Sequence, residues 1–362
     1  MGQAVTASTL KVCASRRPAA VPVLLALAAI TGLAGLVGLG AGPMRIAPLD
    51  ALQALAHRLG FAAAGIAEQQ EAVLFAIRLP RVLLSLAVGA ALATAGAAMQ
   101  GLFRNPLADP GLIGVSGGAA LAAVAAIVLG DKVFHLLDAG MRPWALPVAA
   151  FAGGLAATDL VRRLGLRDGH ASIATILLAG VAINALSGAG IGLLTFLADE
   201  QQLRTLVFWT MGSLGSATWS TLPLALPLII LPTILLLRST RALDAFALGE
   251  REAGHLGVDV ERLKRRLFVL VALATGAAVS VCGIIGFVGL VVPHLLRLAC
   301  GPGHRLVLPG AALLGGALLT AADLAARLTV APAELPIGVV TALVGGPFFL
   351  WLLVRRLRLT DS

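Results

Sequence analysis

The sequence predicts an all-α polytopic membrane protein, on the basis of its composition and of its long uncharged runs. Of the 362 residues, 59% are hydrophobic and only 12% are charged, whereas soluble domains carry about 25% charged residues. The uncharged runs are uniformly apolar and rich in Ala, Leu and Gly, and they lack the alternation of membrane barrel strands. A soluble globular protein is therefore excluded.

Nine runs without Asp, Glu, Lys or Arg are long enough to matter for a bilayer: 18–44, 82–103, 111–130, 143–158, 169–198, 205–237, 267–296, 306–322 and 335–354. The first follows Lys11, Arg16 and Arg17, a pattern that also fits a signal peptide cleaved near Gly40. Because every later run is membrane-like too, we interpret it as an uncleaved first span.

Run 267–296 would be about 45 Å long as one helix, which exceeds a hydrocarbon core of roughly 30 Å. We expect it to break near Gly283, Gly286 and Gly289, ahead of Pro293, which raises the count to ten spans. Run 205–237 is also long, and we interpret 209–216 as a short half-helix before a span over 221–238.

The distribution of basic residues supports ten spans with both termini in the cytoplasm. That topology places 19 basic residues inside and 8 outside, whereas nine spans give 15 and 12, and cytoplasmic loops are the basic ones. The net charge of +9 forms no separate basic face or tail, so a nucleic-acid partner is not indicated. We expect one permease domain over 21–358, between tails 1–20 and 359–362.

Signatures of catalysis or of a bound cofactor are missing from the sequence. There is no GxSxG or GxxxxGK, the six histidines are scattered, and Cys13, Cys282 and Cys300 show no CxxC spacing. A carrier driven by an ion gradient usually needs buried carboxylates, and the spans offer essentially Asp159 and Asp323, both near span ends. A separate ATPase is the better hypothesis, with a secondary transporter or channel as the alternative.

Polar groups within the spans have two interpretations each. Asn184 could form an interhelical hydrogen bond or contact a solute, and Asp323 and Arg327, four residues apart, could form an ion pair or leave Arg327 facing outward. The many glycines fit close helix packing, and they also fit a smooth conduit for a bulky solute.

The polar segment 239–266 is too charged to span a membrane, and its apolar residues recur at helical spacing. Gly249 and Gly257 interrupt that pattern, so we predict two short amphipathic helices. They could lie on the membrane surface, but Glu250 and Glu252 within the apolar stripe favour a protein groove.

Six motifs, in order, resemble the FecCD-type permease subunits of type II ATP-binding-cassette (ABC) importers, which carry iron-siderophores, haem or cobalamin. The resemblance spans about 70–355 and is carried by Arg78–Arg81, Gly96–Ser116, Leu178–Ala182, Ala247–Glu250, Gly286–Arg297 and Glu334–Thr341. It implies a homodimeric permease of the bacterial inner membrane. Two cytoplasmic ATPases would hold ATP and Mg, and a periplasmic binding protein would deliver the solute.

The resemblance also implies roles for individual residues. Arg78, Arg81 and Arg327 would accept carboxylates of the binding protein at the outer rim, because guanidinium groups make bidentate contacts with carboxylates. The ATPase would be contacted by the segment 243–260, with the candidates Leu248, Gly249, Glu250, Ala253, Leu256 and Gly257.

The cytoplasmic gate of the family matches two segments here, and we add Asn184 as a pathway residue. The gate candidates are Asn105, Pro106, Leu107, Ser172, Ile173 and Ala174. Cobalamin members carry hydroxyl residues where this chain has Ile173 and Ala174, so a more apolar solute is indicated. The ending 330–351 looks most similar to haem-importer permeases, so haem is the first expected solute, with cobalamin and ferric siderophores as alternatives, and the chain itself is expected to bind no cofactor.

Overall fold

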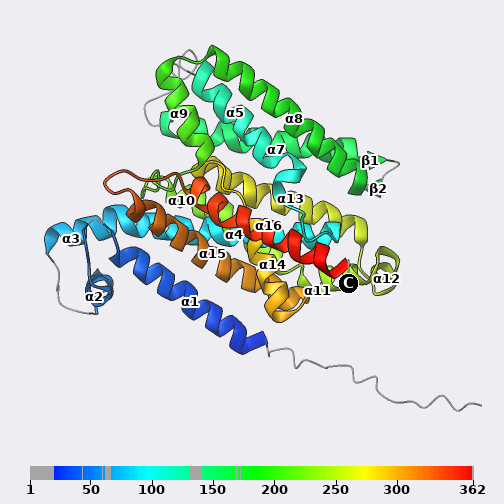
Figure 1. The fold of residues 1–362 in the computed structure, drawn as a ribbon, viewed down its shortest axis with the longest axis horizontal. Helices are drawn as coiled ribbons and strands as arrows, with labels where there is room; N and C mark the ends of the chain where they lie inside the picture. Colours follow the sequence, from blue (N-terminus) through cyan, green and yellow to red (C-terminus); the bar gives the residue numbers. More distant parts are fainter. Residues whose placement is uncertain are drawn as a thin grey trace, which may run out of the picture.

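The computed structural model describes residues 20–42, 44–58, 60–61, 67–130, 141–167, 170–171 and 173–360. These residues form a helical bundle (Figure 1), and their only strands are the antiparallel two-residue pair β1 (Leu166–Arg167) and β2 (His170–Ala171). The helices in chain order are α1 (Ala20–Gly40), α2 (Pro48–Arg58), α3 (Glu68–Val73), η1 (Leu74–Arg78), α4 (Leu79–Phe103), η2 (Pro110–Ile113), α5 (Val115–Leu129), α7 (Arg142–Gly165), α8 (Ile173–Leu197), α9 (Glu200–Met211), α10 (Leu222–Leu237), α11 (Thr240–Leu248), α12 (Glu250–His255), α13 (Val260–Cys282), α14 (Val288–Cys300), α15 (His304–Thr329) and α16 (Ile337–Thr360).

Six helical segments in the described residues are long and apolar enough to cross a bilayer: Ala20–Gly40, Glu68–Phe103, Arg142–Gly165, Ile173–Leu197, Val260–Cys282 and His304–Thr329. A seventh candidate is α10 together with α11, which are bent by 48° relative to each other. Three shorter apolar helices, Val115–Leu129, Val288–Cys300 and Ile337–Leu352, accompany them. The predicted class of a polytopic helical membrane protein is therefore confirmed.

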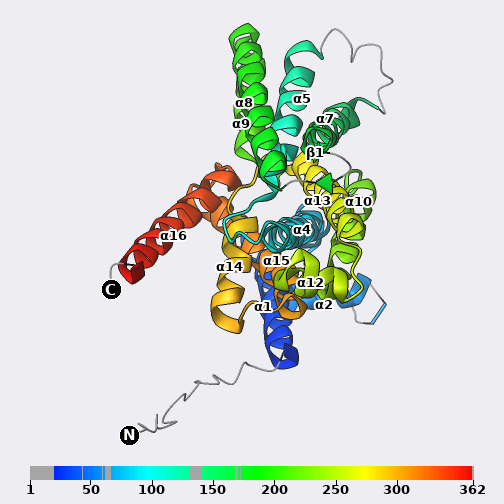
Figure 2. The same ribbon diagram turned by 90° about the vertical axis from the view of Figure 1, so that its right-hand side faces the viewer.

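Helix α4 lies at the centre of the bundle, surrounded by α10, α13, α14 and α15 (Figure 2). Its nearest neighbour is α15, and a Cβ added at Gly89 would overlap the backbone carbonyl of Gly315. A Cβ at Gly96 would likewise overlap the carbonyl of Gly289 in α14. Close packing through small residues is the usual way in which helices associate in lipid. These contacts match close helix packing, one of the two interpretations given to the glycines from the sequence.

Helices α5, α7 and α8 form a second group beside this centre (Figure 1). Here Gly118 and Gly153 allow α5 and α7 to approach each other closely. In contrast, α8 leaves large apolar side chains exposed, and α16 extends away from the bundle (Figure 2) with an exposed apolar face of its own. These two helices are only partly covered by the rest of the chain.

The predicted break in 267–296 is confirmed. Helix α13 ends at Cys282 and α14 begins at Val288. Gly283 has a φ of +71°, a left-handed conformation that glycine adopts without steric cost, and Phe287 caps α14 with a φ of +67°. A residue other than glycine in this conformation is uncommon, so the turn is held by its surroundings.

The half-helix predicted over 209–216 is wrong. Residues 209–211 are instead the end of α9, which begins earlier because Asp199 and Gln202 form a capping box at its N-terminus. Gly212, with a φ of +74°, ends the helix, and the next backbone N–H, from Ser213, donates to the carbonyl of Cys282 at 2.8 Å. The two short helices expected around Gly249 are present as α11 and α12.

Candidate functional site

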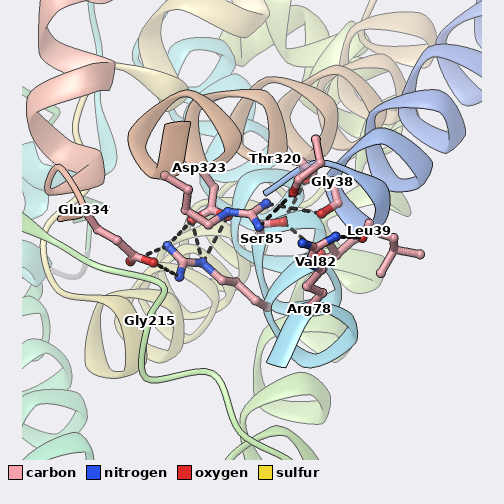
Figure 3. Close-up of polar contacts among 12 residues, drawn as sticks. Gly38, Leu39, Arg78, Val82, Ser85, Gly215, Thr320, Asp323 and Glu334 are labelled. Atoms are coloured by element: carbon pink, nitrogen blue, oxygen red, sulfur yellow. Dashed lines mark hydrogen bonds and ion pairs between the residues drawn. The ribbon is translucent and has the colours of Figure 1, made fainter. Parts of the chain in front are cut away.

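A cluster of four charged residues, Arg81, Asp323, Arg327 and Glu334, joins α4, α15 and the segment before α16 at one end of the bundle (Figure 3). Its central member is Arg81, whose Nη1 and Nη2 donate to Oε1 and Oε2 of Glu334 at 2.9 Å each. The Nε of Arg81 donates to Oδ1 of Asp323, also at 2.9 Å. Such bidentate, charge-assisted contacts are the strong class of hydrogen bond.

Asp323 is shared between two guanidinium groups. Its Oδ2 lies 3.1 Å from Nε of Arg327, and the residue is 1% exposed. The ion pair expected between Arg327 and Asp323 is confirmed. The Nη2 of Arg327 donates at 3.3 Å to the carbonyl of Gly38 in α1, so the cluster also reaches the first helix.

Arg78 closes the C-terminal end of α1. Its guanidinium donates to the carbonyls of Leu39 and Gly40 at 2.7 Å each, and to the carbonyl of Met44. The last carbonyls of a helix lack partners within the helix and carry partial negative charge. A buried arginine at this position therefore satisfies them, which is a structural task that its sequence motif does not reveal.

The three arginines proposed for the outer rim lie near one another, and all three are buried in the structure. Arg78, Arg81 and Arg327 are 3%, 7% and 7% exposed, because the end of α1, Asp323 and Glu334 enclose them. Glu334 is the open member, with a side chain that is 46% exposed. It was missed from the sequence, although it is the single charged residue between Arg327 and Arg355.

The coupling candidates lie at the opposite end of the bundle, on α11 and α12 (Figure 1). Leu248 and Leu256 are 68% and 63% exposed, whereas Ala253 is fully buried against the bundle. Gly249 adopts a φ of +143° between the two helices, and Gly257 follows α12 with a φ of +83°. The candidates therefore divide into an exposed apolar pair, two turn glycines and one residue on the inner face.

Two buried side chains and one ion pair fasten these short helices to long ones. Phe246 is buried, and the guanidinium of Arg104, at the end of α4, lies 4.9 Å from the centre of the Phe246 ring. The sixth candidate, Glu250, accepts a 2.9 Å hydrogen bond from Nζ of Lys264 in α13. Leu243 is fully buried beside Gly101 of α4.

The gate candidates lie in two places. Asn105 accepts a hydrogen bond from the N–H of Leu107 at 2.9 Å, which forms the turn around Pro106. Ile173, partly buried, and Ala174, exposed, begin α8, and Ser172 lies outside the described residues.

Asn184 connects α8 to the segment that follows the first gate loop. Its Nδ2 donates to the carbonyl of Gly111 in η2 at 2.9 Å, so the predicted hydrogen bond between helical segments is confirmed. Asp109 caps η2 by accepting from the N–H of Gly111 at 2.7 Å. Burial raises the pKa of the Asp109 carboxyl, and this hydrogen bond acts in the opposite direction.

A metal centre is not formed by any part of the chain that the structure describes, which holds no group of three or more His, Cys, Asp or Glu suited to an ion. His294 packs against Phe348, with ring centres 6.1 Å apart. His304 pairs with Asp244, with Nδ1 and Oδ1 2.9 Å apart, a contact that the sequence did not suggest. Within the described residues, most of the polar side chains discussed above have a hydrogen-bond or ion-pair partner elsewhere in the chain.

Membrane-length helices, paired buried charges and an exposed apolar loop at one end define a polytopic transport permease. The chain belongs to the FecCD transport family, whose model matches residues 28–355. The resemblance seen in the sequence motifs is thereby confirmed.

Relatives with assigned transport roles match most of the chain. The hemin transport system permease protein HmuU of Yersinia pestis is 54% identical over 280 residues, which cover 77% of this chain and 82% of that protein. The cobalamin import system permease protein BtuC of Halobacterium salinarum is 46% identical over 292 residues, covering 81% and 76%. The vitamin B12 import system permease protein BtuC of Salmonella typhimurium is 42% identical over 337 residues, covering 92% and 95%.

A solved structure, described as an inward-facing conformation of a metal-chelate type ABC transporter, superposes with a TM-score of 0.80 and 31% identity. The match covers 92% of this chain and 99% of that one. The chain is therefore a permease of an ABC importer in the inner membrane. These similarities support this class over a channel or secondary transporter.

The two carboxylates bound to Arg81 should differ in their effect on stability. Asp323→Asn leaves the buried Arg327 guanidinium without its ion-pair partner and leaves Arg81 with the half-exposed Glu334 alone, and removing one partner of a buried pair costs about 3–5 kcal/mol. Glu334→Gln removes a half-exposed partner and should cost under about 1 kcal/mol. Thermal unfolding of the purified variants in detergent measures both, and equal losses would show that Asp323 is not the central counter-ion.

Proposed function

We propose that this permease moves haem, or a related iron chelate or cobalamin, from the periplasm to the cytoplasm by alternating access. The observation that carries the choice of haem is the 54% identity to the hemin permease over 280 residues. The lower identity to the two cobalamin permeases makes cobalamin the second candidate. The energy would come from ATP and Mg bound to a separate ATPase, since FecCD-type permeases work with ATPase and binding-protein partners.

The proposed topology has ten spans with both termini in the cytoplasm, within one domain over 21–358. The six long helices, α10 and the three shorter apolar helices are enough segments for ten crossings, and α11 then belongs to the cytoplasmic segment 239–266. Helix α5 follows the short 3-10 helix η2, and α14 follows the non-helical residues 283–287. Such irregular backbone is tolerated at membrane depth where protein buries it.

The proposed assembly is a homodimer. Helix α8 exposes Leu178, Leu186, Leu193 and Phe196 by 62–85%, and α16 exposes Leu343, Val344 and Leu350 by 60–69%. These faces are apolar along the length of each helix, so lipid or a second copy of the chain must cover them. A path between two copies would then be lined by these weakly polar faces.

The proposed docking site for the binding protein includes the arginine cluster. A buried guanidinium group of the cluster can bind a carboxylate of the binding protein only if a carboxylate of the permease first releases it. Glu334 is the carboxylate placed to release Arg81. Its side chain is half exposed, and the segment that bears it precedes α16. We therefore assign Arg81 the docking contact, while Arg78 and Arg327 hold the surrounding structure through α1.

Uptake into proteoliposomes tests the proposed function. The permease is reconstituted with its cognate ATPase and binding protein, and haem, cobalamin and a ferric siderophore are compared with ATP or with a non-hydrolysable analogue. We expect haem uptake that requires ATP hydrolysis. Uptake without the ATPase would contradict the ABC assignment, and ATP-driven uptake of cobalamin alone would contradict the choice of haem.

The exposed leucines of the coupling loop, the segment 239–266 that contains α11 and α12, should bind the ATPase. Leu248→Ala combined with Leu256→Ala removes two exposed apolar anchors, and truncating a central anchor of an interface costs about 2 kcal/mol or more. We expect the ATPase to bind at least about tenfold more weakly, as measured by co-purification titration. Leu298→Ala, at a leucine of α14 that is 54% exposed, is the control, and an equal loss there would remove α11 and α12 from the interface.

Removing Glu334 should strengthen docking of the binding protein. Glu334→Gln frees the Arg81 guanidinium from a half-exposed competitor, and exposed ion pairs are worth about 0.2–1 kcal/mol, so affinity should rise by a few-fold. Binding to the reconstituted permease at several salt concentrations measures this. Glu200→Gln, an exposed carboxylate on α9 that pairs with Arg204, is the matched control. Weaker docking of the Glu334 variant would mean that Glu334 itself belongs to the contact surface.

A further inference from the structure

The end of α15 that lies against the coupling loop is capped by a side chain from that loop. Oδ1 of Asp244 in α11 accepts two hydrogen bonds from His304, the first residue of α15. The backbone N–H donates at 2.7 Å, and Nδ1 of the ring lies 2.9 Å away. The first backbone N–H groups of a helix have no partners within it, and a carboxylate there is favoured by the helix dipole.

This contact is buried and lies where three helices meet. His304 is 5% exposed, and its Nε2 has no hydrogen-bond partner among the described residues. The ring faces α4, because a Cβ added at Gly101 would lie 2.6 Å from Nε2 and 3.2 Å from a methyl group of Leu243 in α11. The absence of a side chain at Gly101 therefore allows α4, α11 and α15 to touch at one point.

The two long helices at this point continue to the charged cluster at the other end of the bundle. Helix α15 has 26 residues, about 39 Å at 1.5 Å per residue. It carries Asp323, and α4 carries Arg81. Between the two ends, Ser85 and Thr320 form a 2.8 Å hydrogen bond and Gly89 packs on Gly315. The pair α4 and α15 thus connects the coupling loop to the cluster through continuous contact.

We propose that Asp244 is a positioning residue that transmits movement of the coupling helices to α15, through its double hydrogen bond with His304. The proposal rests on the ABC function proposed above. When the ATPases displace α11, the cap at His304 obliges α15 to follow, and α15 moves α4 through their glycine contact. Without the cap, α11 can move against α15, so ATP hydrolysis continues while solute transport does not.

The experiment measures ATP hydrolysed per haem transported by the complete complex of permease, ATPase and binding protein in proteoliposomes. Asp244→Ala should keep the ATPase bound and its rate close to that of the wild type, and should raise this ratio by about fivefold or more, in the range of couplings between distant sites. Asp244→Asn retains an oxygen acceptor for the His304 backbone N–H and should preserve most of the coupling.

A matched control is available in the same loop. Asp259 caps α13 by accepting from the N–H of Arg262 at 2.9 Å, but it is exposed and lies on a different helix. Asp259→Ala removes a helix cap of the same kind and should leave the ratio unchanged. If Asp244→Ala does not assemble, Gly101→Ala displaces the His304 ring from the α4 side and should uncouple the complex in the same way. Gly32→Ala, on α1, where an added Cβ also meets open space, is its control.

Several results would overturn the proposal. An unchanged ratio in Asp244→Ala, a parallel fall of hydrolysis and uptake, or an equal rise in Asp259→Ala would each show that the contact does not transmit movement. These results differ from failure of the proposed function, in which the wild-type complex itself shows no ATP-driven uptake.

Discussion

The packing of α15 along α4 is the contact on which both ends of this permease depend. Lipid is as apolar as the helix surfaces, so helices in a bilayer associate through close packing and polar contacts. This pair has both, with backbone contact at Gly89 and Gly315 and a hydrogen bond between Ser85 and Thr320. The same two helices hold Arg81 and Asp323 at one end and contact the coupling loop at the other. One pair of closely packed helices therefore links the two ends of the bundle.

The charges of the cluster have unequal roles because their burial differs. Asp323 is almost fully buried between Arg81 and Arg327, so its loss leaves charges uncompensated in a low-dielectric region. Glu334 is half exposed, and water can replace most of what it gives to Arg81. One carboxylate is therefore suited to permanent structure and the other to exchange. A docking partner needs a site of the second kind, since an arginine held only by buried partners would not be released.

The features that the sequence predicted well depend on local pattern. The span at 82–103, the break after Cys282 and the short helices around Gly249 follow from hydropathy, length and glycine positions. The half-helix at 209–216 was wrong because an apolar window does not show where a capping box starts a helix. The contacts of buried Arg78 and the Asp244–His304 contact join residues that are 34 or more positions apart. Periodicity carries no information on such pairings, and the family motif included Arg78 without indicating its contacts.

The arrangement also indicates where solute choice can reside. The guanidinium groups of the cluster are bound to Asp323, Glu334 and the carbonyls of α1, so they have little capacity left for a cargo. The buried face of the coupling loop is likewise bound to α4, α13 and α15. The faces of α8 and α16, in contrast, remain exposed and apolar. A haem permease and a cobalamin permease can share the charged cluster and the coupling loop, because the polar groups of these two regions are bound to other groups of the chain. In the proposed dimer, differences in cargo would arise from the shape and polarity of α8 and α16 and of the proposed gate at the start of α8, where Ile173 and Ala174 carry no hydroxyl group.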